Sequence, residues 1–230
     1  MQTKYGLFLI MATAAAAGCQ SGPGSAALET DDQKASYGIG RDIGAQLAPA
    51  SAFIDMDALR RGLEDEFADR EFAVPPSELQ GIMQSFGQRV AQAHQQSTDS
   101  LANANRAEGE AFLARNAEKA GVTTTESGLQ YEVMREGEGP RPSGGQEVRI
   151  HYEGKLVDGT VFDSSYERDT PATFTVGQLI NGFNEGLMLM NVGSQYRLVI
   201  PGDLGYGAQG QGEIGPHATL IFEVELLAIP

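Results

Sequence analysis

The amino-acid sequence predicts an α+β fold in which an all-helical N-terminal region leads, through a long connecting helix, into an antiparallel half-barrel sheet wrapped on a short helix. Two observations support this expectation. Between residues 28 and 120, apolar side chains recur every three or four residues, as along one face of a helix. From Gly121 onward, glycine and proline become frequent and apolar residues alternate with polar ones, which is typical of strands with one buried face.

The composition argues against several classes of function. The 230 residues carry 31 acidic and 16 basic side chains, a formal net charge of −15. We therefore expect no nucleic-acid partner, because phosphate binding needs a basic surface. The single cysteine excludes an intramolecular disulfide and a cysteine-based zinc site, and the three histidines match no metal-ligand spacing. The sequence thus predicts neither a metal nor a cofactor.

The start of the chain predicts export from the cytoplasm. Residues 5–18 are almost all apolar or small, a run too short for a transmembrane helix but suited to the core of a signal peptide. The run ends at Ala16–Cys19, which resembles a bacterial lipoprotein signal whose cysteine is acylated. We expect a signal peptide over 1–18 and a flexible tether over 19–27, with a lipid anchor at Cys19 as the only link to a membrane.

These features place the protein in the bacterial cell envelope. Lipidation would anchor it to the outer membrane, facing either the periplasm or the surface. The alternative is simple export with cleavage after Ala17, which would leave a periplasmic or secreted protein.

Three helices are predicted before residue 121. The first covers Lys34–Leu47. The second begins with Asp57 as its N-cap and runs through Ala68. The third begins with Ser77 as the N-cap of a capping box and extends to Ala120, because no proline follows until Pro140.

The long helix is apolar at its first end only. A stripe at helical spacing comprises Leu79, Ile82, Met83, Phe86 and Val90. Residues 91–110 are mainly Ala, Gln, Asn and Ser, so we expect them to form a solvated arm. Three helices alone make a thin core, and we therefore expect a homodimer formed through residues 28–90. A self-contained three-helix domain is the alternative.

The C-terminal region predicts strands and one short helix. Alternation of apolar and polar residues marks strands at Glu147–Val157, Val161–Phe162, Tyr196–Ile200 and Leu220–Leu226. The first two strands are joined by a tight turn at Val157–Thr160. Helical spacing of apolar residues predicts a short helix over Phe183–Met190, packed against the sheet.

The sequence contains no pattern for covalent catalysis. There is no nucleophile motif, and the glycine-rich residues 202–215 lack the Lys-Ser/Thr pair of a phosphate loop. Aromatic and aliphatic residues instead lie near strand ends, and we expect them to line one apolar cavity. Asp163, directly after Phe162, would add a polar group. The other members of the set are Tyr152, Phe174, Leu179, Ile180, Phe183, Tyr206, Ile214 and Phe222.

The order of these residues resembles an FKBP-type peptidyl-prolyl isomerase domain. The matching strings are Val148–Gly154, Asp158–Ser165, Gly205–Gly207 and Pro216–Leu227. More loosely, Ser36–Gly40 and its surroundings resemble the dimerisation domain of Mip-like members of this family. The resemblance implies an isomerase domain over 121–230 and a helical dimerisation domain over 28–120, including the long helix at about 77–120.

The resemblance also implies residue roles. The catalytic set would be Asp163, Tyr206, Phe183 and Ile180, with Phe183 as the floor of a proline-binding cavity. The substrate-binding set would be Tyr152, Phe162, Phe174, Leu179, Ile214 and Phe222. Two positions depart from the family pattern: Phe183 stands where most members have Trp, and Ala172 stands where an aromatic side chain is common.

The implied activity is non-covalent acceleration of Xaa-Pro isomerisation during the folding of exported proteins. The partners would be unfolded polypeptides that contain proline, and macrolides such as tacrolimus or rapamycin are candidate ligands of the cavity. Two alternatives stay open. One is a dimeric envelope chaperone with weak or absent isomerase activity, and the other is a structural envelope lipoprotein that reuses the fold.

Overall fold

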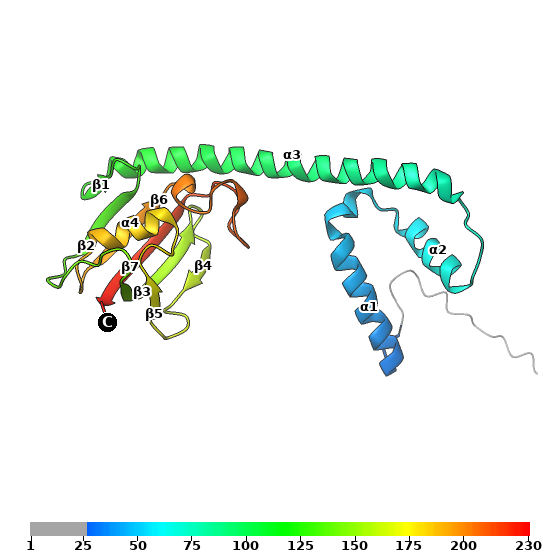
Figure 1. Cartoon of the computed structure of the whole chain (residues 1–230), viewed down its shortest axis with the longest axis horizontal. Helices are drawn as coiled ribbons and strands as arrows, with labels where there is room; N and C mark the ends of the chain where they lie inside the picture. Colours follow the sequence, from blue (N-terminus) through cyan, green and yellow to red (C-terminus); the bar gives the residue numbers. More distant parts are fainter. Residues whose placement is uncertain (1–26) are drawn as a thin grey trace, which may run out of the picture. The chain divides into compact units, whose positions relative to one another are not determined.

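A computed structural model describes residues 27–230, which divide into two compact units, one ending at Phe72 and the other covering Ala73–Pro230 (Figure 1). The predicted signal peptide over 1–18, Cys19 and the tether up to residue 26 lie outside the described residues. The predicted domain boundary near residue 120 stays a prediction. The division found here groups the long helix with the sheet.

The first unit contains α1 (Asp31–Leu47), the 3₁₀ helix η1 (Ala48–Phe53) and α2 (Met56–Phe67). A capping box of Thr30 and Gln33 starts α1. The predicted N-cap at Asp57 is wrong. The carboxylate of Asp55 accepts the N–H groups of Asp57 and Ala58, both at 2.9 Å, so Asp55 is the N-cap and α2 begins at Met56.

The helices of this unit bury almost nothing within the described chain. No residue of α1 or α2 is buried, and only Ala50 in η1 is. Ile39 is 61% exposed and Phe67 is 91% exposed. Other apolar side chains that stay largely exposed here are Tyr37, Ile43, Met56, Leu63 and Phe72. The amphipathic pattern of these helices therefore has no matching core within residues 27–72.

The long helix α3 covers Pro76–Ala117, close to its predicted extent. The predicted capping box at Ser77 is wrong, because the N-cap is Pro75, two residues earlier, and Pro76 lies in the first turn. Proline suits that position, since its missing N–H would have no partner inside the helix and its fixed φ is already helical. No helix within residues 27–230 is both long and apolar enough to cross a membrane.

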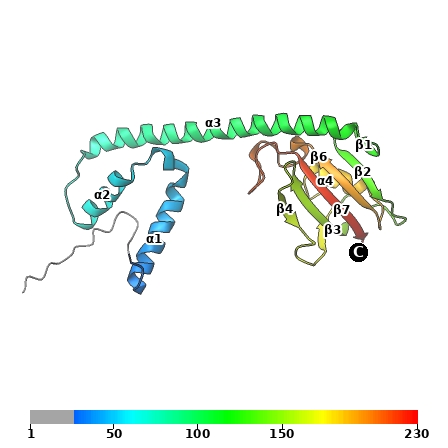
Figure 2. The same ribbon diagram turned by 180° about the vertical axis from the view of Figure 1, so that it is seen from behind.

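The expectation of a solvated arm over 91–110 is wrong for its second half. Along α3, buried or half-buried positions recur every three or four residues from Ala102 to Asn116, so this side of the helix packs on the sheet unit. At Gly109 a side-chain carbon would lie 2.2 Å from Thr219 Oγ1, so only glycine permits this approach. Figure 2 shows α3 running past the loops that precede β7.

Hydrogen bonds secure the same contact. Asn105 Nδ2 donates to the carbonyl oxygen of Pro216 (2.7 Å), and Asn116 Nδ2 donates to Gln130 Oε1 (2.9 Å). Gln130 Nε2 in turn donates to the carbonyl oxygen of Leu113 (2.9 Å). Most of the packed face of α3 thus consists of small and polar residues, with Phe112 and Leu113 as its large apolar members, which explains why a search for apolar periodicity finds little of it.

The rest of the second unit is one antiparallel sheet with a short helix, and the predicted fold class is confirmed. The strand order is β1-β2-β6-β7-β3-β4, and β5 also pairs with β3. The strands are β1 (Val122–Thr124), β2 (Gln130–Arg135), β3 (Glu147–Leu156), β4 (Val161–Ser164), β5 (Ala172–Thr175), β6 (Gln195–Ile200) and β7 (Leu220–Ala228). The helices are α4 (Asn181–Leu189), η2 (Gly202–Leu204) and η3 (Gly207–Gln209).

The structure contains the predicted strands β3, β4, β6 and β7, and the predicted short helix appears as α4. The tight turn between β3 and β4 is also present: the Leu156 N–H donates to the Thr160 carbonyl oxygen (2.9 Å). Sequence reasoning missed β1, β2 and β5. Two of these are only three or four residues long, too short for a pattern of alternation.

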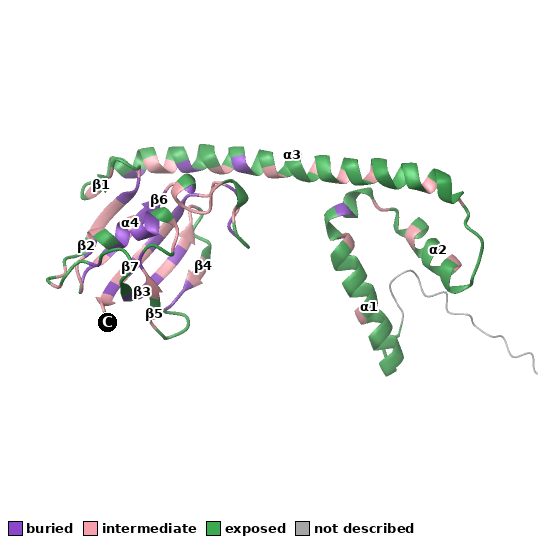
Figure 3. Ribbon diagram, viewed as in Figure 1, coloured by how far each residue is buried: buried purple, intermediate pink, exposed green. Residues whose placement is uncertain are grey.

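One face of the sheet is buried under α4, as the burial colours of Figure 3 show. Leu187 of α4 and Leu198 of β6 are fully buried there. Other members of this core are Leu129, Val148, Ile150, Met190, Ile200, Leu220, Val224 and Leu226. Phe183 and Phe222 belong to the same cluster, and the candidate site is built on them.

Candidate active site

A cavity of about 490 Å³ opens in the sheet unit, and all ten residues predicted for the site line it. They are Tyr152, Phe162, Asp163, Phe174, Leu179, Ile180, Phe183, Tyr206, Ile214 and Phe222. Gln211, Gly212 and Glu213 complete the lining and were not predicted. These three lie in a glycine-rich loop with no apolar pattern, so the sequence carried no signal for them.

The sheet register brings the walls of the cavity together. On β3, Tyr152 and Gly154 point to the same face, and their partners on β7 are Val224 and Phe222. Phe162 and Asp163 come from β4, which pairs with the other edge of β3. Residues far apart in the chain therefore meet above one patch of sheet.

The aromatic rings pack edge to face. The ring centroids of Phe183 and Phe222 are 4.8 Å apart, and those of Phe162 and Phe222 are 5.5 Å apart, each pair with an interplanar angle of 82°. This arrangement suits the charge distribution of aromatic rings. Gly154 makes room for it, since a side-chain carbon there would lie 2.6 Å from Phe162 and 2.7 Å from Phe222. The walls are thus held in place by their own packing.

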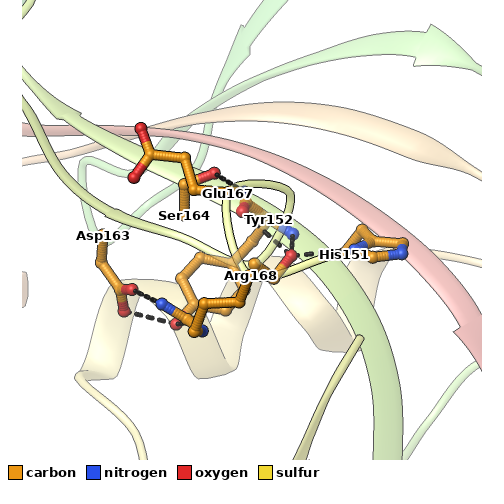
Figure 4. A network of polar contacts seen from close by, with 7 residues as sticks. His151, Tyr152, Asp163, Ser164, Glu167 and Arg168 are labelled. Atoms are coloured by element: carbon orange, nitrogen blue, oxygen red, sulfur yellow. Dashed lines mark hydrogen bonds and ion pairs between the residues drawn. The ribbon is translucent and has the colours of Figure 1, made fainter. Parts of the chain in front are cut away.

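One polar cluster interrupts the apolar wall (Figure 4). The Tyr152 hydroxyl donates a short hydrogen bond to Asp163 Oδ2. Arg168 donates to Asp163 Oδ1 (2.5 Å) and to the Tyr152 hydroxyl oxygen (3.1 Å). Sequence analysis missed Arg168, because nothing in the local pattern shows that the turn after β4 brings it back to Asp163.

The contacts in this cluster shift the pKa values of Tyr152 and Asp163 in opposite directions. Burial, followed by the hydrogen bond to Asp163, raises the pKa of Tyr152 to about 12. Burial raises the pKa of the Asp163 carboxyl, but hydrogen bonds from Tyr152 and Arg168, together with the Arg168 charge, outweigh it and leave that pKa below its ordinary value. At neutral pH the cavity therefore holds a fixed carboxylate and a neutral tyrosine.

The backbone of Tyr152 is held as firmly as its side chain. Its N–H donates to Ser165 Oγ (2.8 Å), and Ser165 is fully buried. The same hydroxyl lies 2.9 Å from His151 Nδ1, and the His151 ring stacks on Tyr166 with centroids 4.7 Å apart. A fully buried hydroxyl cannot act as a nucleophile on a bound substrate, so this Ser-His pair positions the strand.

The Tyr206 hydroxyl and the Ile180 N–H are polar groups of the lining that have no partner within residues 27–230. Burial, then the Asp163 charge, raises the pKa of Tyr206, so its hydroxyl stays protonated at neutral pH. Asn184 orients the Ile180 N–H, because its Nδ2 donates to the Leu179 carbonyl oxygen (2.7 Å) in the same trans peptide. Both groups are free to donate to a ligand.

The arrangement favours binding chemistry. The lining combines a rigid aromatic surface, two free hydrogen-bond donors and one fixed carboxylate, which suits an apolar ring that carries carbonyl groups. Within the described chain, no group of three or more His, Cys, Asp or Glu side chains is placed to hold a metal ion.

Two protein families match this chain. Residues 139–227 match the family described as FKBP-type peptidyl-prolyl cis-trans isomerase. Residues 32–133 match the family described as the domain amino terminal to FKBP-type peptidyl-prolyl isomerase. Together the two matches cover nearly all of the helices and the sheet, and all of the residues that line the cavity lie within 139–227.

Relatives match along nearly the whole chain. The FKBP-type 22 kDa peptidyl-prolyl cis-trans isomerase of Escherichia coli K12 is 43% identical, over 87% of this chain and 97% of that protein. The outer membrane protein MIP of Legionella longbeachae is 36% identical, over 96% of this chain and 93% of its own length. The crystal structure of FkpA from Escherichia coli superposes with a TM-score of 0.68 at 35% identity, covering 88% of this chain and 98% of that one.

The polar cluster leads to a prediction about the pKa of Tyr152. In Asp163→Asn, the pKa of Tyr152 should fall from about 12, because the hydrogen bond to the carboxylate and its negative charge are lost. Tyr152 will then begin to lose its proton at a lower pH than in the unmodified protein. Ring-carbon NMR, titrated as far as the fold survives, measures this, and Tyr196 is the internal control because Asp163 does not influence its pKa. Identical titration of Tyr152 in both proteins would contradict the assignment.

Proposed function

The chain belongs to the FKBP-type peptidyl-prolyl cis-trans isomerases, and we propose that it accelerates Xaa-Pro isomerisation in exported proteins while they fold, by holding proline non-covalently in the aromatic cavity. The observation that carries this proposal is the convergence of rigid aromatic walls and two unengaged donors on one cavity. The activity itself follows from the family.

The cavity suits the proline ring. Phe183 is the floor, and Tyr152, Phe174 and Phe222 are the walls. Proline has no backbone N–H, so an apolar floor leaves no donor of the substrate unsatisfied. The Ile180 N–H and the Tyr206 hydroxyl donate to substrate carbonyl groups, which fixes the chain on either side of the rotating bond.

Rotation needs no covalent step. The barrier to rotation about the amide bond, about 18–20 kcal/mol, comes from resonance in the planar peptide. An unassisted Xaa-Pro bond therefore isomerises in tens to hundreds of seconds. The planar amide is more charge-separated than the twisted one, so removing water from its carbonyl favours the twisted state. Asp163, locked by Tyr152 and Arg168, adds a fixed field near that carbonyl.

The same cavity is proposed to bind macrolides such as tacrolimus and rapamycin. A volume of about 490 Å³ lies within the range of small-molecule sites, about 300–1,000 Å³. A macrolide that occupies the floor at Phe183 competes with proline. Inhibition by rapamycin therefore reports on the cavity itself.

A chaperone function is the second candidate, and it rests on the first unit. In a dimeric chaperone, apolar side chains of α1 and α2 that the dimer interface leaves exposed would offer a surface on which unfolded chains can bind. Phe183 in place of Trp, and Ala172 at the lip, are the features that favour weak isomerase activity beside such binding.

The isomerase mechanism is tested with short Xaa-Pro peptides and the chain from residue 28 onward. Tyr206→Phe keeps the ring but removes a hydrogen bond to the substrate, so kcat/KM should fall by about threefold to tenfold. Phe183→Ala removes the floor, and kcat/KM should fall by about tenfold or more. Rapamycin should inhibit the unmodified protein.

Tyr131→Phe is the matched control, because Tyr131 lies on β2 and stacks on Tyr196 outside the cavity. Circular dichroism checks that each variant is folded. If Tyr206→Phe and Phe183→Ala both had the same kcat/KM as the unmodified protein, the assigned roles would be refuted. A folded protein without any catalysis would favour the chaperone function.

We further propose a homodimer formed through residues 28–90. In support, α1, α2 and the start of α3 expose apolar side chains, with Ile39 at 61%, Phe67 at 91% and Met83 at 60%. No residue of α1 or α2 is buried, and a second copy would supply the missing cover. The match of residues 32–133 to the N-terminal family domain is consistent with this assignment.

The dimer is tested by sedimentation at micromolar concentration. The unmodified chain should sediment as a dimer, and Phe67→Asp combined with Met83→Asp should sediment as a monomer, because a charge in an apolar interface is costly. Met134→Asp is the control, as Met134 is exposed on β2, outside the proposed interface. A monomeric unmodified chain would rule the dimer out.

Finally, we propose that the protein is exported to the cell envelope and anchored to the outer membrane through acylated Cys19. The Ala16–Cys19 string supports this, and one relative is itself named an outer membrane protein. Cys19→Ser should move the protein from the detergent fraction to the soluble fraction. Unchanged partitioning would favour simple export.

A further inference from the structure

A second hollow, of about 190 Å³, lies beside the aromatic cavity in the same unit. Its walls come from α3, from the turn between β3 and β4, and from the loop that precedes β7. Glu213 lines both the hollow and the aromatic cavity, so the two spaces share a wall. A polypeptide held by its proline can therefore extend from one to the other.

The hollow is rigid because α3 is fixed to the loop beneath it. Asn105, one of its lining residues, donates to the Pro216 carbonyl oxygen (2.7 Å). Leu101 packs against Gly215, where a side-chain carbon would lie 3.3 Å from its Cδ2. Leu101 is nevertheless 49% exposed, and with Leu156 it provides an apolar surface inside the hollow.

Three carboxylates surround this apolar surface: Glu108 on α3, Asp158 in the turn and Glu213 in the loop. None of them forms an ion pair within residues 27–230, although Asp158 accepts the Thr160 N–H (2.9 Å). No three acidic side chains in the described chain come close enough to hold a metal ion. Their negative charges beside an apolar surface suit a long cationic side chain.

We propose that this hollow, with its acidic rim, binds a lysine or arginine side chain of the client polypeptide whose proline occupies the aromatic cavity. The aliphatic stem lies on Leu101 and Leu156, and the charged end reaches the carboxylates, as such side chains do on mixed surfaces. The inference rests on the proposed function and adds to it a substrate class: proline-containing segments with a basic residue nearby. The arm helix then takes part in choosing the substrate.

The test compares two peptide series with the same Xaa-Pro core. One series carries Lys at successive positions on either side of the core, and the other carries Gln at those positions. The full-length protein should show higher kcat/KM for Lys than for Gln at one position, by about 1.5-fold to fivefold at low ionic strength. The preference should shrink at physiological salt, because exposed charges are screened.

Variants locate the effect. Glu108→Gln and Glu213→Gln should each bring the Lys/Gln ratio of kcat/KM toward one. Glu110→Gln is the matched control: it makes the same change of charge on α3, but Glu110 lines a different hollow, beside His217. In this control the ratio should persist.

The outcomes separate the two proposals. Catalysis with no Lys preference at any position overturns the acidic subsite and leaves the isomerase mechanism intact. An equal loss of preference in Glu110→Gln and Glu108→Gln also overturns it, since the preference would then reflect only the overall charge of −15. Absence of catalysis on either series counts against the proposed function instead.

Discussion

The antiparallel pairing of β3 with β7 is the constraint on which the rest of the sheet unit depends. It sets Gly154 opposite Phe222 and Tyr152 opposite Val224, so that both aromatic rings rise from the face that α4 covers. A slip of one residue would turn these side chains to the other face. β4 and α4 then add their aromatic residues to a base that the central pair has already oriented.

Some polar groups of the cavity are hydrogen-bonded to one another, and others have no partner. Asp163, Tyr152 and Arg168 satisfy one another, and this fixes a charge inside an aromatic wall at little conformational cost. The Tyr206 hydroxyl and the Ile180 N–H are left without partners in the described chain. Rigid surroundings keep these donors aimed into the space, which is what a site for a non-covalent reaction requires.

The second half of α3 packs closely against the loop that forms the rim of this site. Gly109 lies against Thr219 and Asn105 bonds to Pro216, so α3 bears on the loop that carries Ile214 and Glu213. The rim of the cavity and the second half of α3 are therefore in direct contact. In the proposed acidic subsite, a substrate that extends past the rim would contact α3.

The sequence by itself determined the strands with long alternation, the tight turn between β3 and β4, and the extent of α3, because these depend on neighbours in the chain. The order of its motifs also named ten residues that the structure places around one cavity. Only the tertiary structure decided the N-caps at Asp55 and Pro75, the contact along Gly109, and the parts played by Arg168 and Asn184. Which of two candidate caps, two residues apart, starts the helix depends on the backbone conformation before it. The contacts of Gly109, Arg168 and Asn184 join small or polar side chains across a turn or across the fold. A periodic sequence pattern reveals only buried apolar side chains, so it does not reveal these contacts.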